Sequence, residues 1–210
     1  MARYDRSLKR RAARREPARR FILFCEGEKT EPAYFDALRR SIGNALVEVT
    51  AIHAGVPMTI AGRAVERARR RKGKDSFEQH DQVWAVFDRD EHPNYEDATR
   101  LCEQHKVRVA RSNPCFEVWL ILHEEDYQRP DDRHQAQAHL RKLRPEYDPA
   151  GSKTCNFREM IARIEHAEER ARRQLQLREE EGPPFAPPST TVGHLTEAIR
   201  KAAKEAAGDA

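Results

Sequence analysis

Paired cysteines, long apolar runs and internal repeats are missing from this 210-residue chain. Its four cysteines lie far apart and form no C-x-x-C pair, which argues against a zinc site and against a disulfide framework. No stretch of eighteen apolar residues is present, so the sequence predicts no membrane-spanning helix. Scattered cysteines in a chain without a recognisable signal peptide predict reduced thiols, and we therefore expect a cytoplasmic protein.

Charge, in contrast, is abundant and unevenly distributed. Charged residues make up 35% of the chain, and Lys and Arg outnumber Asp and Glu by 39 to 35. Nine of the first twenty residues are basic and two are acidic. Such a block is typical of a disordered arm that attracts nucleic acid, and equally of a solvated leader that aids solubility. We expect residues 1–19 to form a basic disordered arm.

The first part of the chain alternates apolar runs with segments of helical periodicity. The run at 21–25 has no polar alternation, which is typical of a buried strand in a parallel sheet. The predicted strands are 21–25, 47–52, 82–87 and 106–110, and the predicted helices are 31–41, with Thr30 as N-cap, 57–72 and 95–105. This order predicts an α/β fold with a parallel sheet flanked by helices, over residues 20–125.

The remainder of the chain has the pattern of helices. The predicted segments are 116–122, 133–143, 156–180 and 191–207. We expect residues 126–210 to form a C-terminal helical extension that packs on the α/β domain. The mixed charges of the segment from 156 onward are typical of a solvated or partner-facing surface with i,i+4 ion pairs.

Acidic residues follow two of the predicted strands directly. Glu26 comes after the first strand, and Asp88 and Asp90 come after the third. Ligands of open parallel sheets bind beyond the carboxyl ends of the strands, so these acids meet if the two strands are neighbours. Close carboxylates repel one another unless a cation lies among them, and oxygen ligands without His or Cys favour Mg²⁺ or Mn²⁺. Taken singly, each acid has the alternative of a helix cap or a solvated loop charge.

Two further acids and one glycine belong to the candidate site. Glu31 lies at a helix start, where it either reaches the metal or complements the helix dipole. Glu117 lies in an apolar segment, so it is either metal-linked or paired with an arginine such as Arg89 or Arg111. Gly27 allows the turn after the first strand to approach a phosphate or a metal-bound water closely. The candidate metal ligands are Glu26, Glu31, Asp88, Asp90 and Glu117, and the candidate nucleic-acid contacts are Arg63, Arg67, Arg70, Arg89 and Arg111.

Three motifs carry a resemblance to a known family. They are CEGEKTEPAYF at 25–35, DRD at 88–90 and SNPCFEVWL at 112–120, followed by Leu122 and His123. The first two look like the Toprim fold of primases, topoisomerases and overcoming-lysogenization-defect nucleases. All three together resemble the RloB family of bacterial proteins.

The resemblance implies a Toprim-like site. Glu26 would act as general acid/base or metal ligand, and Asp88 and Asp90 would bind Mg²⁺. The family is associated with restriction loci and abortive infection, which implies a role in phage defence. A partner protein encoded at the defence locus is also implied.

Three functions follow from these observations. A metal-dependent nuclease, with Glu26, Asp88 and Asp90 as catalytic residues, accounts for most of them. The alternative is a non-catalytic sensor subunit that binds nucleic acid or a partner through its basic arm and charged tail. A nucleotide-processing phosphotransferase is disfavoured because no G-x-x-x-x-G-K-[ST] phosphate loop is present.

Overall fold

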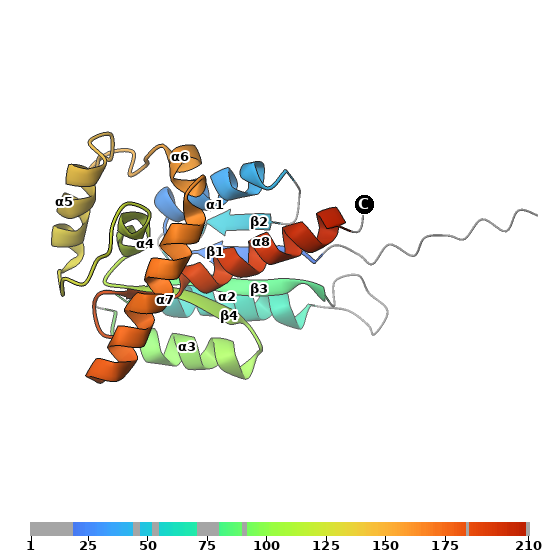
Figure 1. The fold of residues 1–210 in the computed structure, drawn as a ribbon. Coiled ribbons are helices and arrows are strands. Elements are labelled where there is room, and N and C mark those ends of the chain that lie inside the picture. The colour runs from blue at the N-terminus through green and yellow to red at the C-terminus, as the bar shows by residue number, and fades with distance from the viewer. Residues whose placement is uncertain are drawn as a thin grey trace, which may run out of the picture.

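The computed structural model describes residues 19–43, 47–51, 55–70, 80–89, 92–183 and 185–208. Apart from Arg19, the predicted basic arm lies outside the described residues. Two layers of helices enclose a central sheet in the described part of the chain (Figure 1).

Five strands form the sheet, in the order β2-β1-β3-β4-β5. They are β1 (Phe21–Cys25), β2 (Val47–Ala51), β3 (Gln82–Asp88), β4 (Arg108–Asn113) and β5 (Ser189–Thr190). The first four strands are mutually parallel, as predicted. The prediction of a purely helical C-terminal region is wrong at β5, which pairs antiparallel with β4. A strand of two residues is too short to produce a hydrophobic pattern, and the pairing with β4 holds it in place.

The predicted helices are confirmed with ends shifted by a few residues, except in the segment 156–180. The helices are α1 (Thr30–Ser41), α2 (Pro57–Arg69), α3 (Tyr95–Gln104), α4 (Glu117–Leu122), α5 (Arg133–Leu143), α6 (Phe157–Ile161), α7 (Ile164–Glu181) and α8 (Val192–Gly208). The break between α6 and α7 has its cause at Met160. The Met160 carbonyl accepts from the amide of Arg163 and from the buried Nδ1 of His123, both at 2.9 Å. The backbone hydrogen bond at this turn therefore joins residues three apart, as in a 3₁₀-helix, instead of four apart as in an α-helix.

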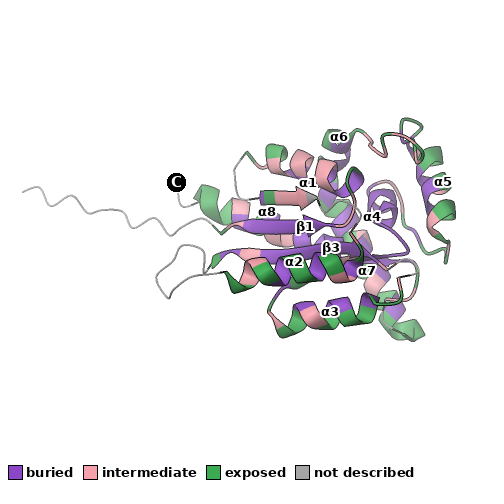
Figure 2. Cartoon of the chain, turned by 180° about the vertical axis from the view of Figure 1, so that it is seen from behind, coloured by how far each residue is buried: buried purple, intermediate pink, exposed green. Residues whose placement is uncertain are grey.

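The strands bury both faces, because successive side chains point to opposite sides of the sheet. Ile22 and Phe24 of β1 pack under α2 and α3, whereas Leu23 and Cys25 face α1, α4, α7 and α8. Figure 2 shows the strands buried between helices whose outer faces are exposed. This burial on both sides explains the continuous apolar runs in the sequence.

The chain order creates a switch point between β1 and β3. Helix α1 connects β1 to β2 on one face, and α2 then carries the chain to β3 over the other face. The parallel strands point towards the end of the molecule where α4 and α5 lie (Figure 1). Ligand sites of open α/β sheets form at such a switch point, outside the carboxyl ends of the strands.

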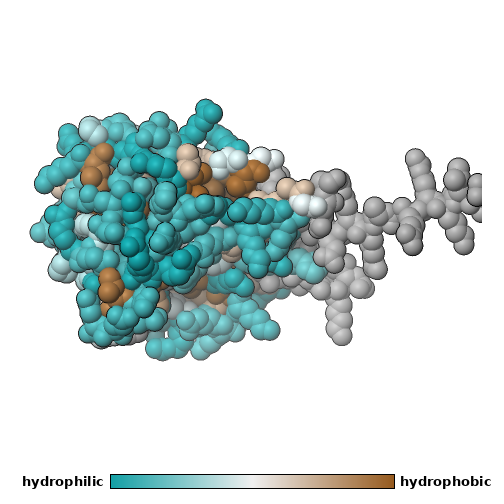
Figure 3. Space-filling model, in the orientation of Figure 1, coloured by the Kyte–Doolittle hydropathy of each residue, from teal (hydrophilic) through white to brown (hydrophobic). Residues whose placement is uncertain are grey.

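The surface is mainly polar. The face in Figure 3 is hydrophilic apart from small, separate apolar patches. Among the described residues, the large apolar side chains that are exposed are Val56 and Leu177. No described helix has the length and apolar character needed to cross a lipid bilayer.

Candidate functional site

Glu26 and Asp88 meet at the switch point, as the sequence predicted for neighbouring strands. Cys25 of β1 is in register with Val86 of β3, and the Glu26 amide extends the pairing by donating to the Val86 carbonyl at 3.0 Å. The Glu26 Oε2 atom in turn accepts from the Asp88 amide at 3.1 Å. Its Oε1 atom lies 3.2 Å from Nε2 of His92. The Glu26 carboxylate is therefore held across the ends of both strands.

Glu31 turns back from the first turn of α1 onto the loop that follows β1. Its Oε1 atom accepts from the Gly27 amide at 3.2 Å, and the residue is only 5% exposed. A Cβ atom at position 27 would lie 1.8 Å from the Glu31 Oε2 atom. The close approach that requires glycine is therefore made by the Glu31 carboxylate, whereas the approach of a phosphate or a metal-bound water to this turn stays a prediction.

The N-terminus of α1 also differs from the prediction. Thr30 is the first residue of the helix and does not act as its cap, because Lys29 occupies the N-cap position. The Thr30 hydroxyl instead donates to the Lys153 carbonyl at 3.1 Å. The same segment accepts a second bond, since Lys29 Nζ donates to the Gly151 carbonyl at 2.9 Å. Both bonds fix the segment between α5 and α6 against the start of α1.

Glu117 is the fourth carboxylate and is 4% exposed at the start of α4. Its Oε1 atom accepts from Gln137 Nε2 at 3.2 Å and from the Tyr147 hydroxyl. Neither bond is the ion pair with Arg89 or Arg111 that the sequence left open. Two neutral donors stabilise the buried carboxylate without cancelling its charge.

These side chains surround one cavity of about 400 Å³, which we call the carboxylate cavity. Its walls come from the β1–α1 loop, the end of β3, the start of α4, helix α5 and the segment before α6. The lining residues are Glu26, Gly27, Glu28, Lys29, Thr30, Glu31, Gly55, Asp88, Phe116, Glu117, Arg133, Gln137, Ala150, Gly151 and Lys153.

The electrostatics of the cavity disfavour the ionised acids as they stand. Burial, together with the neighbouring charges of Glu117 and Glu26, raises the pKa of Glu31 to about 7. Burial also raises the pKa of Asp88 well above its ordinary value, and the charges of Glu31, Glu117 and Glu26 add to this shift. A cation among the carboxylates would reverse both effects.

Sequence reasoning missed the contribution of α5 to the cavity. Arg133 Nη2 lies 3.4 Å from Asp88 Oδ2, and Gln137 binds Glu117 one turn later. The motif Asp132-x-x-Gln135 forms a capping box that starts the helix, and positions 133 and 137 then share one helix face. These local signals exist in the sequence, but none of them indicates which part of the sheet α5 faces.

One of the metal ligands predicted from the sequence, Asp90, lies outside the described residues. Its position relative to Asp88 therefore stays a prediction. Among the described side chains, no group of three or more His, Cys, Asp or Glu residues is arranged as it stands to hold a metal ion. The oxygen-only donors of Glu26, Glu31, Asp88 and Glu117 nevertheless match a hard cation in chemistry.

The predicted nucleic-acid contacts divide into two groups. Arg63, Arg67 and Arg70 lie on or next to α2, and none of them lines the carboxylate cavity. Arg70 Nη2 pairs with Glu66, whose other oxygen lies 3.8 Å from Arg63 Nη1. Arg67 Nη2 lies 3.8 Å from a carboxylate oxygen of Asp81. Acids of the same region thus partly neutralise this group.

Arg89 and Arg111 form the second group, on the face of the sheet that α3 covers. They line a hollow of about 300 Å³ together with Tyr95 and Phe185. The Arg111 guanidinium lies 3.2 Å from the Phe185 ring centre, and the Arg89 guanidinium lies 5.8 Å from the ring centre of Tyr95. Because Arg89 directly follows Asp88, this arginine–aromatic hollow begins next to the carboxylate cavity but on the opposite face of the sheet.

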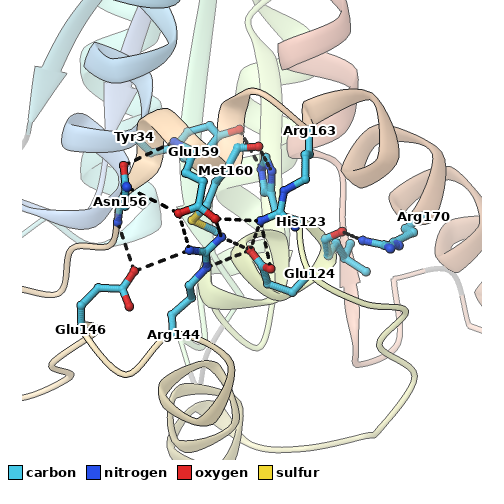
Figure 4. A network of polar contacts seen from close by, with 11 residues as sticks. Tyr34, His123, Glu124, Arg144, Glu146, Asn156, Glu159, Met160, Arg163 and Arg170 are labelled. Atoms are coloured by element: carbon cyan, nitrogen blue, oxygen red, sulfur yellow. Dashed lines mark hydrogen bonds and ion pairs between the residues drawn. The ribbon is translucent and has the colours of Figure 1, made fainter.

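His123 has a structural position away from the cavity. It is 1% exposed, and burial lowers its pKa to about 3. Its Nδ1–H donates to the Met160 carbonyl at 2.9 Å, so Nε2 is the acceptor for the Tyr34 hydroxyl at 3.0 Å. Figure 4 shows this histidine beside a network in which Arg144 and Arg163 share the carboxylates of Glu124 and Glu159.

Comparison with known proteins gave one match. A family model described as RloB-like protein matches residues 21–199, which include all five strands and the carboxylate cavity. No curated protein and no solved structure matches the chain.

Proposed function

Because the chain belongs to the RloB-like protein family, we propose that its carboxylate cavity performs metal-dependent phosphodiester chemistry on nucleic acid, as a Toprim-like nuclease. One observation carries the proposal. Glu26 and Asp88 leave adjacent parallel strands at the switch point and line a single cavity with Glu31 and Glu117. Four acids around one cavity at this position destabilise the fold unless a cation binds among them, and such a cation could in turn bind an anionic substrate.

Mg²⁺ or Mn²⁺ is the cofactor that suits these donors. Asp88 and Glu31 would hold it together with Asp90, and Glu26 and Glu117 would complete the set or a second site. Bound there, the metal would polarise a phosphate oxygen of the substrate. Burial, and after it mutual repulsion, raises the pKa values of Glu31 and Asp88. A divalent cation would remove the repulsion, which supports this assignment.

Glu26 is the residue that we assign to proton transfer. Its carboxylate accepts from the Asp88 amide, which fixes its orientation at the cavity wall. The neighbouring His92 Nε2, 3.2 Å from Oε1, gives the carboxylate a partner whose charge depends on protonation. This environment suits a general acid/base that must gain and lose a proton during the reaction.

The biological setting belongs to the same proposal. The family's association with restriction loci and abortive infection supports a role in phage defence in the bacterial cytoplasm. A partner protein from the defence locus would then control the activity, and the mixed charges exposed on α7 suit such a contact.

A cleavage assay tests the nuclease. Labelled single- and double-stranded DNA and RNA would be incubated with Mg²⁺ or Mn²⁺ and either wild type or the Asp88→Ala, Asp90→Ala double variant. We expect metal-dependent cutting by wild type and a loss of at least roughly a hundredfold in the variant, because ligands of the metal are removed. Equal cutting by both proteins would contradict the assignment of the site.

A non-catalytic sensor is the second candidate, and the arginine–aromatic hollow favours it. The Arg111 guanidinium lies over the Phe185 ring and the Arg89 guanidinium lies near Tyr95. Positive charge beside aromatic rings is typical of surfaces that bind nucleic acid without cutting it. Deletion of residues 1–19 separates the two functions. A sensor would lose its ligand, whereas a nuclease would keep its chemistry and lose affinity in a salt-dependent way.

A further inference from the structure

The carboxylate cavity has walls of both charge signs. Besides the acids, the same space is lined by three cations, Lys29, Arg133 and Lys153. Lys29 already donates to the Gly151 carbonyl, which fixes the segment before α6. Arg133 is the cation whose guanidinium approaches an acid of the site, at 3.4 Å from Asp88 Oδ2, and its side chain is still 36% exposed. One cation thus contacts both the buried acid and the open space of the cavity.

The position of Arg133 is unfavourable for its own helix. It is the first residue of α5, directly after the Asp132 cap, where the helix dipole disfavours a positive charge. Pairing with Asp88 offsets this cost. Gln137, one turn further on, binds Glu117, so the same face of α5 supplies polar contacts to two of the four acids. Helix α5 therefore presents a specific face to the cavity.

We propose that Arg133 is a surrogate cation for Asp88, that is, a positive side chain that occupies the place of the metal. Arg133 pairs with Asp88 while the metal is absent, and it contacts a phosphate of the nucleic acid once the metal has bound. The inference rests on the proposed function and adds an order of events, with metal binding before substrate. A guanidinium suits both partners, because its planar fork matches a carboxylate and a phosphate equally well. Because part of the Arg133 side chain is exposed, the guanidinium can exchange the carboxylate for a phosphate without a movement of α5.

A purely structural ion pair makes a different prediction. If Arg133 only neutralised Asp88, its removal would lower stability and leave nucleic-acid binding unchanged. If it is a surrogate cation, its removal should affect the two ligands in opposite directions. The metal would bind more tightly, because a competing positive charge is gone. The nucleic acid would bind more weakly, because a charge-assisted contact to phosphate is lost.

The test is a pair of binding titrations on Arg133→Gln and wild type, carried out in the same buffer at one pH. Mn²⁺ binding would be followed by electron paramagnetic resonance. Binding of fluorescein-labelled oligothymidylate and oligouridylate would be followed by anisotropy with Ca²⁺ present. We expect Mn²⁺ affinity to rise roughly tenfold and affinity for the better oligonucleotide to fall roughly tenfold or more. Arg141→Gln, an exposed change on the same helix, should change neither.

Arg133→Lys keeps the charge but not the fork, and should keep Mn²⁺ affinity near wild type while restoring only part of the oligonucleotide binding. Unchanged oligonucleotide binding in Arg133→Gln, or a fall in both affinities, would overturn the inference. Because neither titration needs turnover, these outcomes are separate from failure of the nuclease proposal, which is absence of metal-dependent cutting by wild type. Far-ultraviolet circular dichroism of each variant would exclude misfolding as the cause.

Discussion

Gly27 has a defined steric role at the scale of one residue. The Glu31 carboxylate occupies the space where any other residue would place its Cβ atom. It also accepts the Gly27 amide, so the loop and the carboxylate hold each other in place. A sequence can suggest that glycine permits a close approach, but it cannot tell which group comes close.

Replacement of Gly27 by alanine should therefore displace Glu31. We expect Gly27→Ala to lower the free energy of unfolding by about 1–3 kcal/mol, as overpacking does elsewhere, and to reduce cutting because Glu31 leaves its position. Gly62→Ala is the matched control, since no atom lies within 4 Å of a Cβ atom built there, and it should leave stability equal or slightly higher. Urea unfolding measures both. A Gly27→Ala protein as stable and active as wild type would contradict this role.

Four of the five acids assigned from the sequence can be placed, and all four line one cavity. This was predictable for the two strand-terminal acids, because neighbouring parallel strands share an edge of the sheet, whereas the sequence left a second role open for the other two. Arg133 and Gln137, which line the cavity, and Tyr147, which binds one of its acids, were not predictable, because all three lie beyond the last motif. Their identity follows from tertiary packing, which the local pattern does not contain.

At the scale of elements, His123 joins three helices. It lies directly after α4, receives a hydrogen bond from Tyr34 of α1 and donates to Met160 of α6. Its ring is buried against Trp119 and Tyr34 at centroid distances of 5.0 and 5.6 Å. With the proton on Nδ1, the neutral ring makes both hydrogen bonds, and burial favours this form over the charged ring.

This burial predicts a specific loss of stability in acid. The folded pKa is about 3 and the ordinary value is 6.5, so unfolding takes up a proton as the pH falls through this window. Stability should therefore drop below pH 6.5, by about 1.4 kcal/mol per pH unit from this residue alone. Urea unfolding at pH 7 and 5 should show a shallower pH dependence for His123→Gln than for wild type. The same change at exposed His134 is the control, and equal slopes in all three proteins would contradict the assignment.

The elements themselves followed from periodicity in most cases. Apolar runs predicted β1 to β4, and 3.6-residue spacing predicted the helices. The failures are local and have physical causes. The α6–α7 break depends on a distant histidine that binds the Met160 carbonyl, and β5 depends on pairing with β4. The residue pattern within a segment does not show which distant residue or strand that segment will contact.

At the scale of the whole molecule, Arg144 connects the C-terminal region to the end of α4. Its guanidinium contacts Glu124 at 2.6 Å, Glu159 at 3.0 Å and Glu146 at 3.8 Å (Figure 4). The side chain is only 10% exposed. The segment that follows it brings Gly151 and Lys153 to the wall of the carboxylate cavity and Tyr147 to Glu117. The network therefore holds the wall that this segment contributes.

Loss of this arginine should destabilise the protein and loosen that wall. We expect Arg144→Gln to lower the free energy of unfolding by about 1–3 kcal/mol, because the partly buried hydrogen bonds to Glu124 and Glu159 are lost and Arg163 alone of the described cations remains beside both acids. Arg158→Gln, an exposed change on α6, should have an effect within about 0.5 kcal/mol. Thermal and urea unfolding of both variants would measure the difference. Similar small effects at both positions would show that the network contributes little.

The most direct test of the account is to locate the metal. A crystal soaked in Mn²⁺ would be measured for anomalous scattering. We predict a peak in the carboxylate cavity at about 2.1 Å from an Asp88 oxygen, and its loss in Asp88→Asn crystals. A peak elsewhere, or no peak in the cavity at saturating Mn²⁺, would contradict the claim that these carboxylates form a metal site.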